Sequence, residues 1–234
     1  MGRINPSVVA TAVLCALMSV WGQPASADDA QDARQLVEKA RLTFESFSAD
    51  TTLGDNLRNL VNKARGVLIY PQVLRGAFII GVSGGSGVLV VRDLGSGKWG
   101  GPAFYTIGEV SFGLQAGGDA SEVVLVALTD RGVSALLSTS GKLGANASIA
   151  LGPVGVGLTG ATANLSADIV SYSRNKGLYA GLSLEGAVVA VREALNTGYY
   201  GKEVTPTQIL IQREVSNPQA EGLIGAIVKV AGGS

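Results

Sequence analysis

The chain has 234 residues, of which 47% are hydrophobic and 15% are charged, and its 18 basic residues equal its 18 acidic residues. This balance argues against a nucleic-acid-binding protein, which normally carries a strong basic excess. The chain has no histidine and one cysteine, so serine–histidine and cysteine–histidine catalysis and typical zinc sites are excluded. We therefore expect no cofactor, no metal and no nucleic-acid partner.

The first 27 residues are typical of a secretory signal peptide. Arg3 is the only charged residue before Asp28, an apolar run follows it, and small residues occupy positions 25–27. The apolar run is shorter than the roughly 20 residues that a transmembrane helix needs. We expect cleavage before Asp28, export to the periplasm or the extracellular space with possible membrane association, and a single domain over residues 28–234.

Two helices are predicted at the start of the mature chain. Over residues 28–49, apolar residues recur every three or four positions, as in an amphipathic helix. A second helix is predicted to begin near Thr52, which resembles a capping residue together with Asp55. The polar face of the first helix has mixed charge, which favours docking on the core over lipid binding.

From Val67 onward, short runs of β-branched and aromatic residues are bounded by glycines, a pattern typical of hairpins. A helix capped by Thr129 is predicted to interrupt the strands, and residues 218–233 are predicted to contain a packing helix. The predicted fold is α+β. N-terminal helices pack on a twisted, mainly antiparallel, partly barrel-like sheet of glycine-rich hairpins, and a C-terminal helix follows.

Two glycine-rich segments, residues 81–93 and 181–193, align without gaps and share five identical residues. The alignment predicts two related hairpins in pseudo-symmetric positions, with Gly85 and Glu185 in corresponding turns. A turn carboxylate that fixes the hairpin is the expected role of Glu185, because catalysis would need a second titratable group nearby.

Four segments, taken in order, resemble the SYLF domain: "KARGVLIYPQVLRGAFIIGVSGGSGVLVVR", "GKWGGPAFYTIGEVSFGLQAGG", "SYSRNKGLYAGLSLEGAVVAVR" and "NTGYYG". The resemblance covers about residues 50–201. It implies binding of phosphoinositides or anionic lipids without catalysis, and actin binding in eukaryotic members. With its signal peptide, the chain resembles the exported bacterial branch, for which a phospholipid or glycolipid headgroup is the expected ligand and actin follows only from family resemblance.

Basic residues are the candidate ligands of such a headgroup, because guanidinium groups bind phosphate oxygens in bidentate geometry. Scattered surface charge is the alternative interpretation. The candidates flank the start of the β region or lie in a predicted turn; they are Lys63, Arg65, Arg75, Arg174 and Lys176.

Aromatic residues in a predicted loop are candidates for membrane contact, since amphipathic rings favour the bilayer interface. These are Trp99, Phe104 and Tyr105, and packing of the loop over the core is the alternative. Structural or ligand-orienting roles are predicted for Glu185, Arg92 and Arg192.

Asp119 and Glu122 could offer oxygen ligands to calcium, although their spacing favours a polar turn.

Two other functions are compatible with the sequence. A small outer-membrane β-barrel or structural envelope protein fits the glycines and short strands, but aromatic residues make up only 6% of the chain. A carboxylate-based hydrolase would use Glu185 with Asp168 or Glu109, but no spacing singles out a pair. The preferred prediction is non-catalytic binding of phospholipid or phosphoinositide-like headgroups at a membrane surface.

Overall fold

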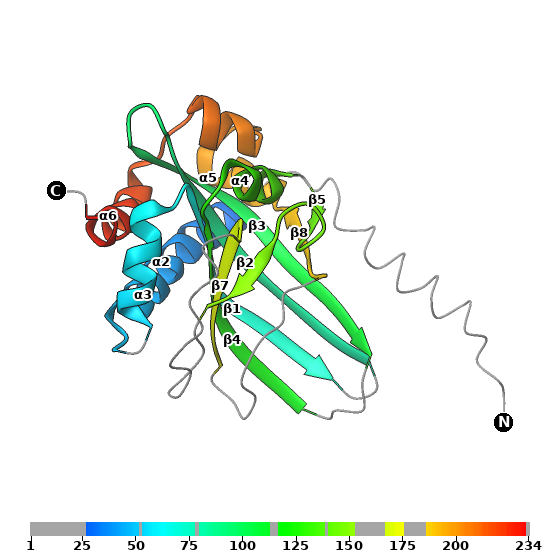
Figure 1. Cartoon of the computed structure of the whole chain (residues 1–234). Coiled ribbons are helices and arrows are strands. Elements are labelled where there is room, and N and C mark those ends of the chain that lie inside the picture. The colour runs from blue at the N-terminus through cyan, green and yellow to red at the C-terminus, as the bar shows by residue number, and fades with distance from the viewer. Residues whose placement is uncertain are drawn as a thin grey trace, which may run out of the picture.

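The computed structural model in Figure 1 describes residues 27–51, 53–77, 80–112, 117–138, 140–152, 167–175 and 186–232. Residues 1–26 of the predicted signal peptide, Lys176 and Glu185 lie outside the described residues.

Two helices precede the sheet, as predicted. In α2 (Ala27–Ala49) the three-to-four spacing places one apolar stripe, which includes Phe44 and Phe47, against the core. The second helix, α3 (Gly54–Lys63), has Leu53 at its N-cap and receives no side-chain cap from it. The Asp50 carboxylate instead accepts a hydrogen bond from the Leu53 N–H at 3.0 Å.

The strands form one mixed sheet in the order β5-β8-β3-β2-β1-β4-β7-β6. All neighbouring strands in it are antiparallel except β6 and β7. The bounds are β1 (Gly66–Ala77), β2 (Ile80–Arg92), β3 (Trp99–Phe112), β4 (Gly117–Ala127), β5 (Ser140–Lys142), β6 (Ile149–Leu151), β7 (Ile169–Asn175) and β8 (Val188–Val191).

The predicted hairpin turn at Gly85 is wrong. Residues 80–92 form one continuous strand, and Gly85 pairs with Val73 and Ile107 in its middle. A Cβ atom at Gly85 would lie 2.2 Å from the carbonyl oxygen of Gln72, where the pairing of β1 with β2 shifts register. This glycine therefore permits a close approach of two strands and does not turn the chain.

The two aligned segments, residues 81–93 and 181–193, were predicted to form two related hairpins, and the structure places their described residues differently. In the described residues, the two aligned segments contribute β2 and β8, which pair with opposite sides of the same strand, β3. Strand β4 does not pair with β3 but crosses over to β1, so β3 and β4 do not form a hairpin although they follow one another in the chain.

Both faces of the sheet are covered, because alternate residues of each strand point to opposite sides. One face packs against α2, α3, α5 (Glu193–Tyr200) and α6 (Glu221–Val230). The other face packs against α4 (Asp130–Leu137) and the π-helix η1 (Gln208–Gln212). A short 3-10 helix, η2 (Pro218–Ala220), precedes α6, which is the predicted C-terminal packing helix.

The sheet curls around the face that bears α4. Strands β5 and β6 lie at opposite ends of the strand order, yet only residues 143–148 connect them. Leu143 and Ala147 of this connection are buried in the core on that side. We call this side the concave face; the predicted barrel-like curvature is thus confirmed.

Thr129 caps α4 as predicted, since its side-chain oxygen accepts the Gly132 N–H at 3.0 Å. No helix in the described ranges is long and apolar enough to cross a membrane.

Candidate functional site

Basic residues from four separate parts of the chain meet where β1 begins and β2 ends. Arg65 precedes β1 and Arg92 ends β2; the Arg92 N–H donates to the Arg65 carbonyl at 2.8 Å. Lys63 ends α3, two residues before Arg65. The Arg213 Nη2 donates to the Lys98 carbonyl at 2.7 Å, which brings the C-terminal part of the chain to the β2–β3 connection. We call these five residues the basic end.

Two arginines of the basic end are held by the surrounding backbone and by one acid. Arg92 donates from Nη1 to the Asn62 carbonyl at 3.0 Å and from Nε to the Gly97 carbonyl at 3.2 Å. Arg65 forms an ion pair with Asp130, the first residue of α4. The guanidinium groups are thereby oriented before any ligand arrives.

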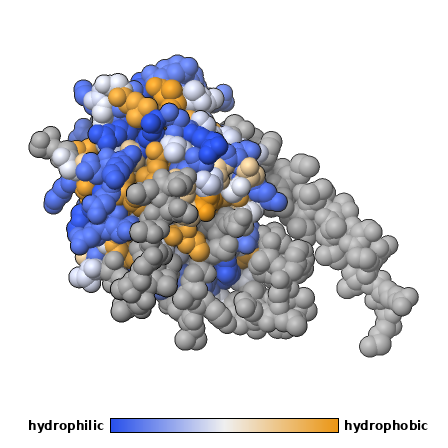
Figure 2. Space-filling model, viewed as in Figure 1, coloured by the Kyte–Doolittle hydropathy of each residue, from blue (hydrophilic) through white to orange (hydrophobic). Residues whose placement is uncertain are grey.

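A hollow of about 260 Å³ opens at the basic end. Its lining combines Arg65 and Arg92 with two acidic residues, Asp93 and Asp130, and with five apolar side chains, of which Leu94 and Ile211 are exposed. Leu94 is 63% exposed and Ile211 is 47% exposed, and both line the same hollow. Figure 2 shows apolar surface among hydrophilic side chains at the top of the view, where the β2–β3 connection and η1 lie in Figure 1. Such a site can hold an anionic group beside an apolar one.

Two predicted ligands, Arg75 and Arg174, lie elsewhere. Arg75 follows Arg65 by ten residues along an extended strand, roughly 33 Å away, and its Nη2 lies 3.6 Å from Glu109 Oε2. Arg174 bonds Glu122 at 2.6 Å and stacks 4.6 Å from the Phe47 ring. The structure therefore brings Lys63 and Arg65 together but not the predicted five-residue patch.

The predicted membrane contact by Trp99, Phe104 and Tyr105 is wrong. These residues belong to β3 and not to a loop, and their exposed fractions are 8%, 0% and 0%. Trp99 and Phe104 lie in the helix-covered core and Tyr105 lies in the concave core. Trp99 and Phe104 share a face because the pairing of β2 with β3 shifts register between them. A bilayer cannot reach them.

Arg192, which directly follows β8 and was predicted to be structural, donates from Nη1 to the Ser86 hydroxyl at 2.9 Å and so connects the end of β8 to β2 across β3. The two suggested calcium ligands do not converge. Glu122 bonds Arg174 and Asp119 approaches Asn175 at 3.4 Å, on opposite faces of β4. In the described residues there is no group of three or more potential metal ligands.

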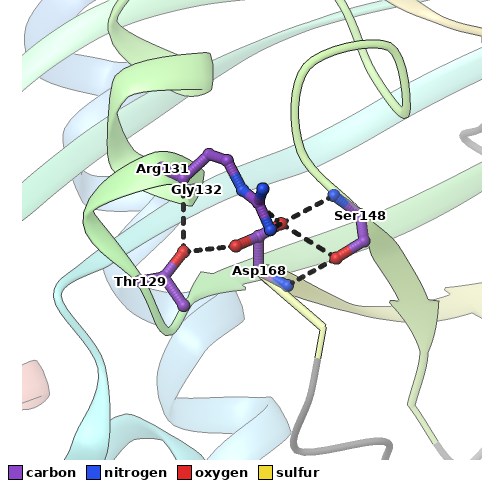
Figure 3. Close-up of polar contacts among 5 residues, drawn as sticks. All are labelled: Thr129, Arg131, Gly132, Ser148 and Asp168. Carbon is purple, nitrogen blue, oxygen red and sulfur yellow. Dashed lines mark hydrogen bonds and ion pairs between the residues drawn. The ribbon is translucent and has the colours of Figure 1, made fainter.

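Asp168 is a buried carboxylate that joins three parts of the fold (Figure 3). It accepts hydrogen bonds from the Thr129 hydroxyl at 2.6 Å, from Arg131 Nε at 3.0 Å and from the Ser148 N–H at 2.9 Å. These donors, the Thr129 hydroxyl first among them, hold the pKa of Asp168 well below its usual range. Asp168 therefore stays ionised and fixes α4 beside β6 and β7, which does not suit a proton-donating acid.

The sequence model of the Ysc84 family, described as "Las17-binding protein actin regulator", matches residues 108–230 of the chain. The chain belongs to this family, whose shared unit is the SYLF domain. It is 34% identical over 167 residues to the human "SH3 domain-containing YSC84-like protein 1", covering 70% of this chain and 48% of the human one.

Fungal proteins of the family are similar at the same level. Identity is 32% over 166 residues with the SH3 domain-containing protein PJ696.02 of Schizosaccharomyces pombe, covering 69% of this chain and 38% of that one. It is 31% over 171 residues with Protein YSC84 of Saccharomyces cerevisiae, covering 70% and 36%. The SYLF chain thus spans half or less of the length of these relatives.

Sequence reasoning missed Lys98, Arg213 and the two exposed apolar residues of the basic end. Lys98 and Arg213 are 115 residues apart, so no local pattern connects them. Leu94 offered one usable signal, because a large apolar residue stands alone in the polar stretch "RDLGSGK".

Proposed function

We propose that this SYLF protein is a non-catalytic lipid-binding protein that holds anionic phospholipid headgroups, phosphoinositide-like ones included, at its basic end. The observation that carries the proposal is the hollow where oriented arginines adjoin the exposed side chains of Leu94 and Ile211. A membrane surface offers the matching pair, anionic headgroups above hydrocarbon. Membership of a family for which lipid binding is expected supports the same function.

The electrostatics must be local, because basic and acidic residues balance over the whole chain. The charges that line the hollow balance, two arginines against Asp93 and Asp130, so the excess comes from the other residues of the basic end, Lys63, Lys98 and Arg213, which bring the net formal charge of these seven residues to +3. Attraction to an anionic membrane is worth about 1 kcal/mol for each basic residue near the surface and decays within a Debye length. Binding should therefore weaken as salt rises.

Replacing Lys63, Arg65 and Lys98 with serine is expected to weaken binding to anionic liposomes by about two orders of magnitude at low salt, at about 1 kcal/mol per residue. Arg92 is left in place because it supports the backbone. Binding is measured by co-pelleting the mature protein, residues 28–234, with liposomes. The liposomes consist either of phosphatidylcholine alone or of phosphatidylcholine with added phosphatidylserine or phosphoinositide.

The matched control removes three exposed lysines elsewhere, Lys142, Lys202 and Lys229. This variant loses the same charge and should keep most of its binding. Equal losses in both variants, or binding indifferent to salt, would contradict a local site. If only a Leu94→Ser variant lost liposome binding, insertion of apolar side chains would contribute more to binding than the basic residues do.

We also propose that the protein is exported and that its mature form begins at Asp28. The support is the charged, apolar and small-residue order of the first 27 residues. Intact-mass measurement of the protein recovered from outside the cytoplasm is expected to show this start, and a mass that includes Met1 would contradict it. Actin remains a partner suggested by the family description alone.

A further inference from the structure

The long strands extend beyond the helices at the end of the sheet away from the basic end. In Figure 1 this part of β1, β2, β3 and β4 reaches to the lower right, past the labelled helices. Residues that point there to the concave face are still buried, such as Val73 and Ile107, each 2% exposed. Their neighbours along each strand point to the opposite side, which no helix of the described residues covers at this end, and they are exposed or half-buried.

Five residues form a row straight across this uncovered side, one from each of five neighbouring strands. Leu74 of β1 pairs with Ala120 of β4 and with Gly84 of β2. Gly108 of β3 pairs with Gly84 and with Val188 of β8. Directly opposite residues share a face of the sheet, so all five point the same way. Leu74 is 55% exposed and Val188 is 44% exposed. The row therefore has two protruding apolar side chains with two glycines between them.

The two glycines form the floor of a shallow groove between Leu74 and Val188. Three strand spacings separate these two residues, roughly 14 Å. A Cβ atom would have no atom closer than 3.6 Å at Gly84 and 3.8 Å at Gly108, and neither glycine has a positive φ. The monomer therefore needs glycine at neither position, unlike at Gly85. Glycine weakens a strand and often marks a place where another molecule approaches closely.

The next row along the strands has the same character. Gly76 of β1 pairs with Val82 of β2 and with Gly118 of β4, and Val82 is 57% exposed. We call the eight residues of these two rows the open face, and none of them is charged. Antiparallel sheets normally present polar side chains to water on an uncovered face, and exposed apolar patches mark interaction surfaces. The open face therefore has the composition of an interface.

The shape of the open face fits a second copy of the chain, because each copy offers both a protruding side chain and a groove. A two-fold axis parallel to the strands, between β1 and β2, places Leu74 of each copy over Gly84 and Gly108 of the other. Sheets that pack face to face keep their strand directions within about 30° of each other, which this axis allows. A membrane fits less well, since anionic headgroups bind basic residues and bilayer interfaces favour aromatic rings. The open face has neither.

The size of the open face sets the strength of such a dimer. Five strands and four residue steps cover roughly 300 Å². Beside Ala120 the face continues into a hollow of about 290 Å³ whose lining includes Leu42 and Pro71, together with the charged Lys39 and Glu122. Leu42 is 51% exposed. Stable complexes bury about 800 Å² on each partner, so these areas correspond to a weak dimer that forms at high protein concentration.

We propose that the protein forms a two-fold symmetric dimer through the open face, with Leu74 of each copy in the glycine-floored groove of the other. Arg65 precedes Leu74 by nine residues along the extended β1, roughly 30 Å, so the basic end of each copy stays free. Dimerisation does not depend on the headgroup binding proposed above, and either experiment can fail without affecting the other.

The test is sedimentation equilibrium of the mature protein at concentrations from about 10 µM to 1 mM, the range that suits a weak complex. The average mass should rise towards that of a dimer. Leu74→Ser should raise the dissociation constant at least about tenfold, because an apolar side chain is lost from both halves of the interface. Gly84→Val fills the groove and should also prevent dimerisation, whereas its urea unfolding at low concentration should show a monomer at least as stable as the native one.

The matched control is Leu151→Ser, because Leu151 is 54% exposed but belongs to β6, at the far end of the strand order. This variant should dimerise as the native protein does. A monomeric mass at every concentration, or an equal loss in the control, would overturn the proposal. Co-pelleting of a monomeric native protein with phosphatidylcholine liposomes that Leu74→Ser abolishes would also overturn it, and would assign the open face to lipid.

Discussion

We expect the Asp168→Asn variant to melt well below the native protein at neutral pH, although the two side chains have nearly the same shape. Both oxygens of the Asp168 carboxylate accept hydrogen bonds. Oδ1 accepts one from the Thr129 hydroxyl, and Oδ2 accepts one from Arg131 Nε and one from the Ser148 N–H. An asparagine has one acceptor oxygen and one NH₂ group, so with its oxygen toward Arg131 and Ser148 it can no longer accept the Thr129 hydroxyl, and it also loses the negative charge opposite Arg131. Thermal unfolding followed by circular dichroism measures the loss.

The difference between the two proteins should depend on pH in one direction. The folded-state pKa of Asp168 lies below its ordinary value of 3.8, so the unfolded chain takes up the proton first as the pH falls. The carboxylate therefore stabilises the fold at pH values above 3.8, and this contribution is lost as the pH falls through the folded-state pKa. The difference in melting temperature between the native protein and the Asp168→Asn variant is expected to be largest at neutral pH and to decrease as the pH falls below 3.8.

Asp130→Asn is the matched control. Asp130 lies two residues upstream of Gly132 in the same helix start, but its side chain is 75% exposed and pairs with Arg65 at the surface. Exposed ion pairs contribute little to stability, so this variant should melt close to the native protein. A gap for Asp168→Asn that stayed constant down to pH 2, or was no larger than the control's, would show that the network does not stabilise α4.

Four helices, α2, α3, α4 and α6, were predictable in this chain because their signals are local, whereas α5 and η1 were not predicted. The apolar stripe of α2 and the hydroxyl of Thr129 before α4 each act within a few residues, and both predictions are confirmed. The cap of α3 was predicted less well, because Asp50 and not a residue at the helix start satisfies the Leu53 N–H. The sequence pointed to Thr52 as the cap, whereas the conformation of the loop between α2 and α3 places Asp50 there.

The basic end could be predicted only in part. Lys63 and Arg65 are neighbours in the sequence, so their proximity was evident. Arg75 is only ten residues from Arg65 in the sequence, but these residues form an extended strand. The distance between the two arginines is therefore about twice the distance that ten residues span in a helix. Lys98 and Arg213 join the site through the pairing of β2 with β3 and the position of η1, which depend on the whole fold.

Glycine was the least informative signal. The run "GVSGGSG" reads as a turn, because glycine permits turn conformations that other residues avoid. In β2 the same residues are extended, and Gly85 is there because the backbone of β1 passes too close for a side chain. A turn glycine and a close-approach glycine differ only in their long-range neighbours, so the sequence alone could not separate them.

A Gly85→Ala variant is therefore expected to be strongly destabilised. The added Cβ would lie 2.2 Å from the Gln72 carbonyl oxygen and 3.1 Å from the Val73 Cα, and both are backbone atoms. Strand β1 cannot move aside easily, because it is paired with β4 on its other edge. The loss in free energy of unfolding should reach or exceed the upper end of the roughly 1–3 kcal/mol typical of overpacking. Urea unfolding of the purified protein measures it.

Gly76→Ala gives the comparison within the same sheet. Gly76 lies in β1, the partner strand of Gly85, is exposed, and has no atom within 4 Å of the position that a Cβ atom would take. Its replacement should be neutral or should stabilise the protein by about 0.4–1 kcal/mol, because alanine reduces the freedom of the unfolded chain. If both variants were equally stable, β1 and β2 would not be paired closely at Gln72, and the interpretation of Gly85 as a turn residue would regain its support.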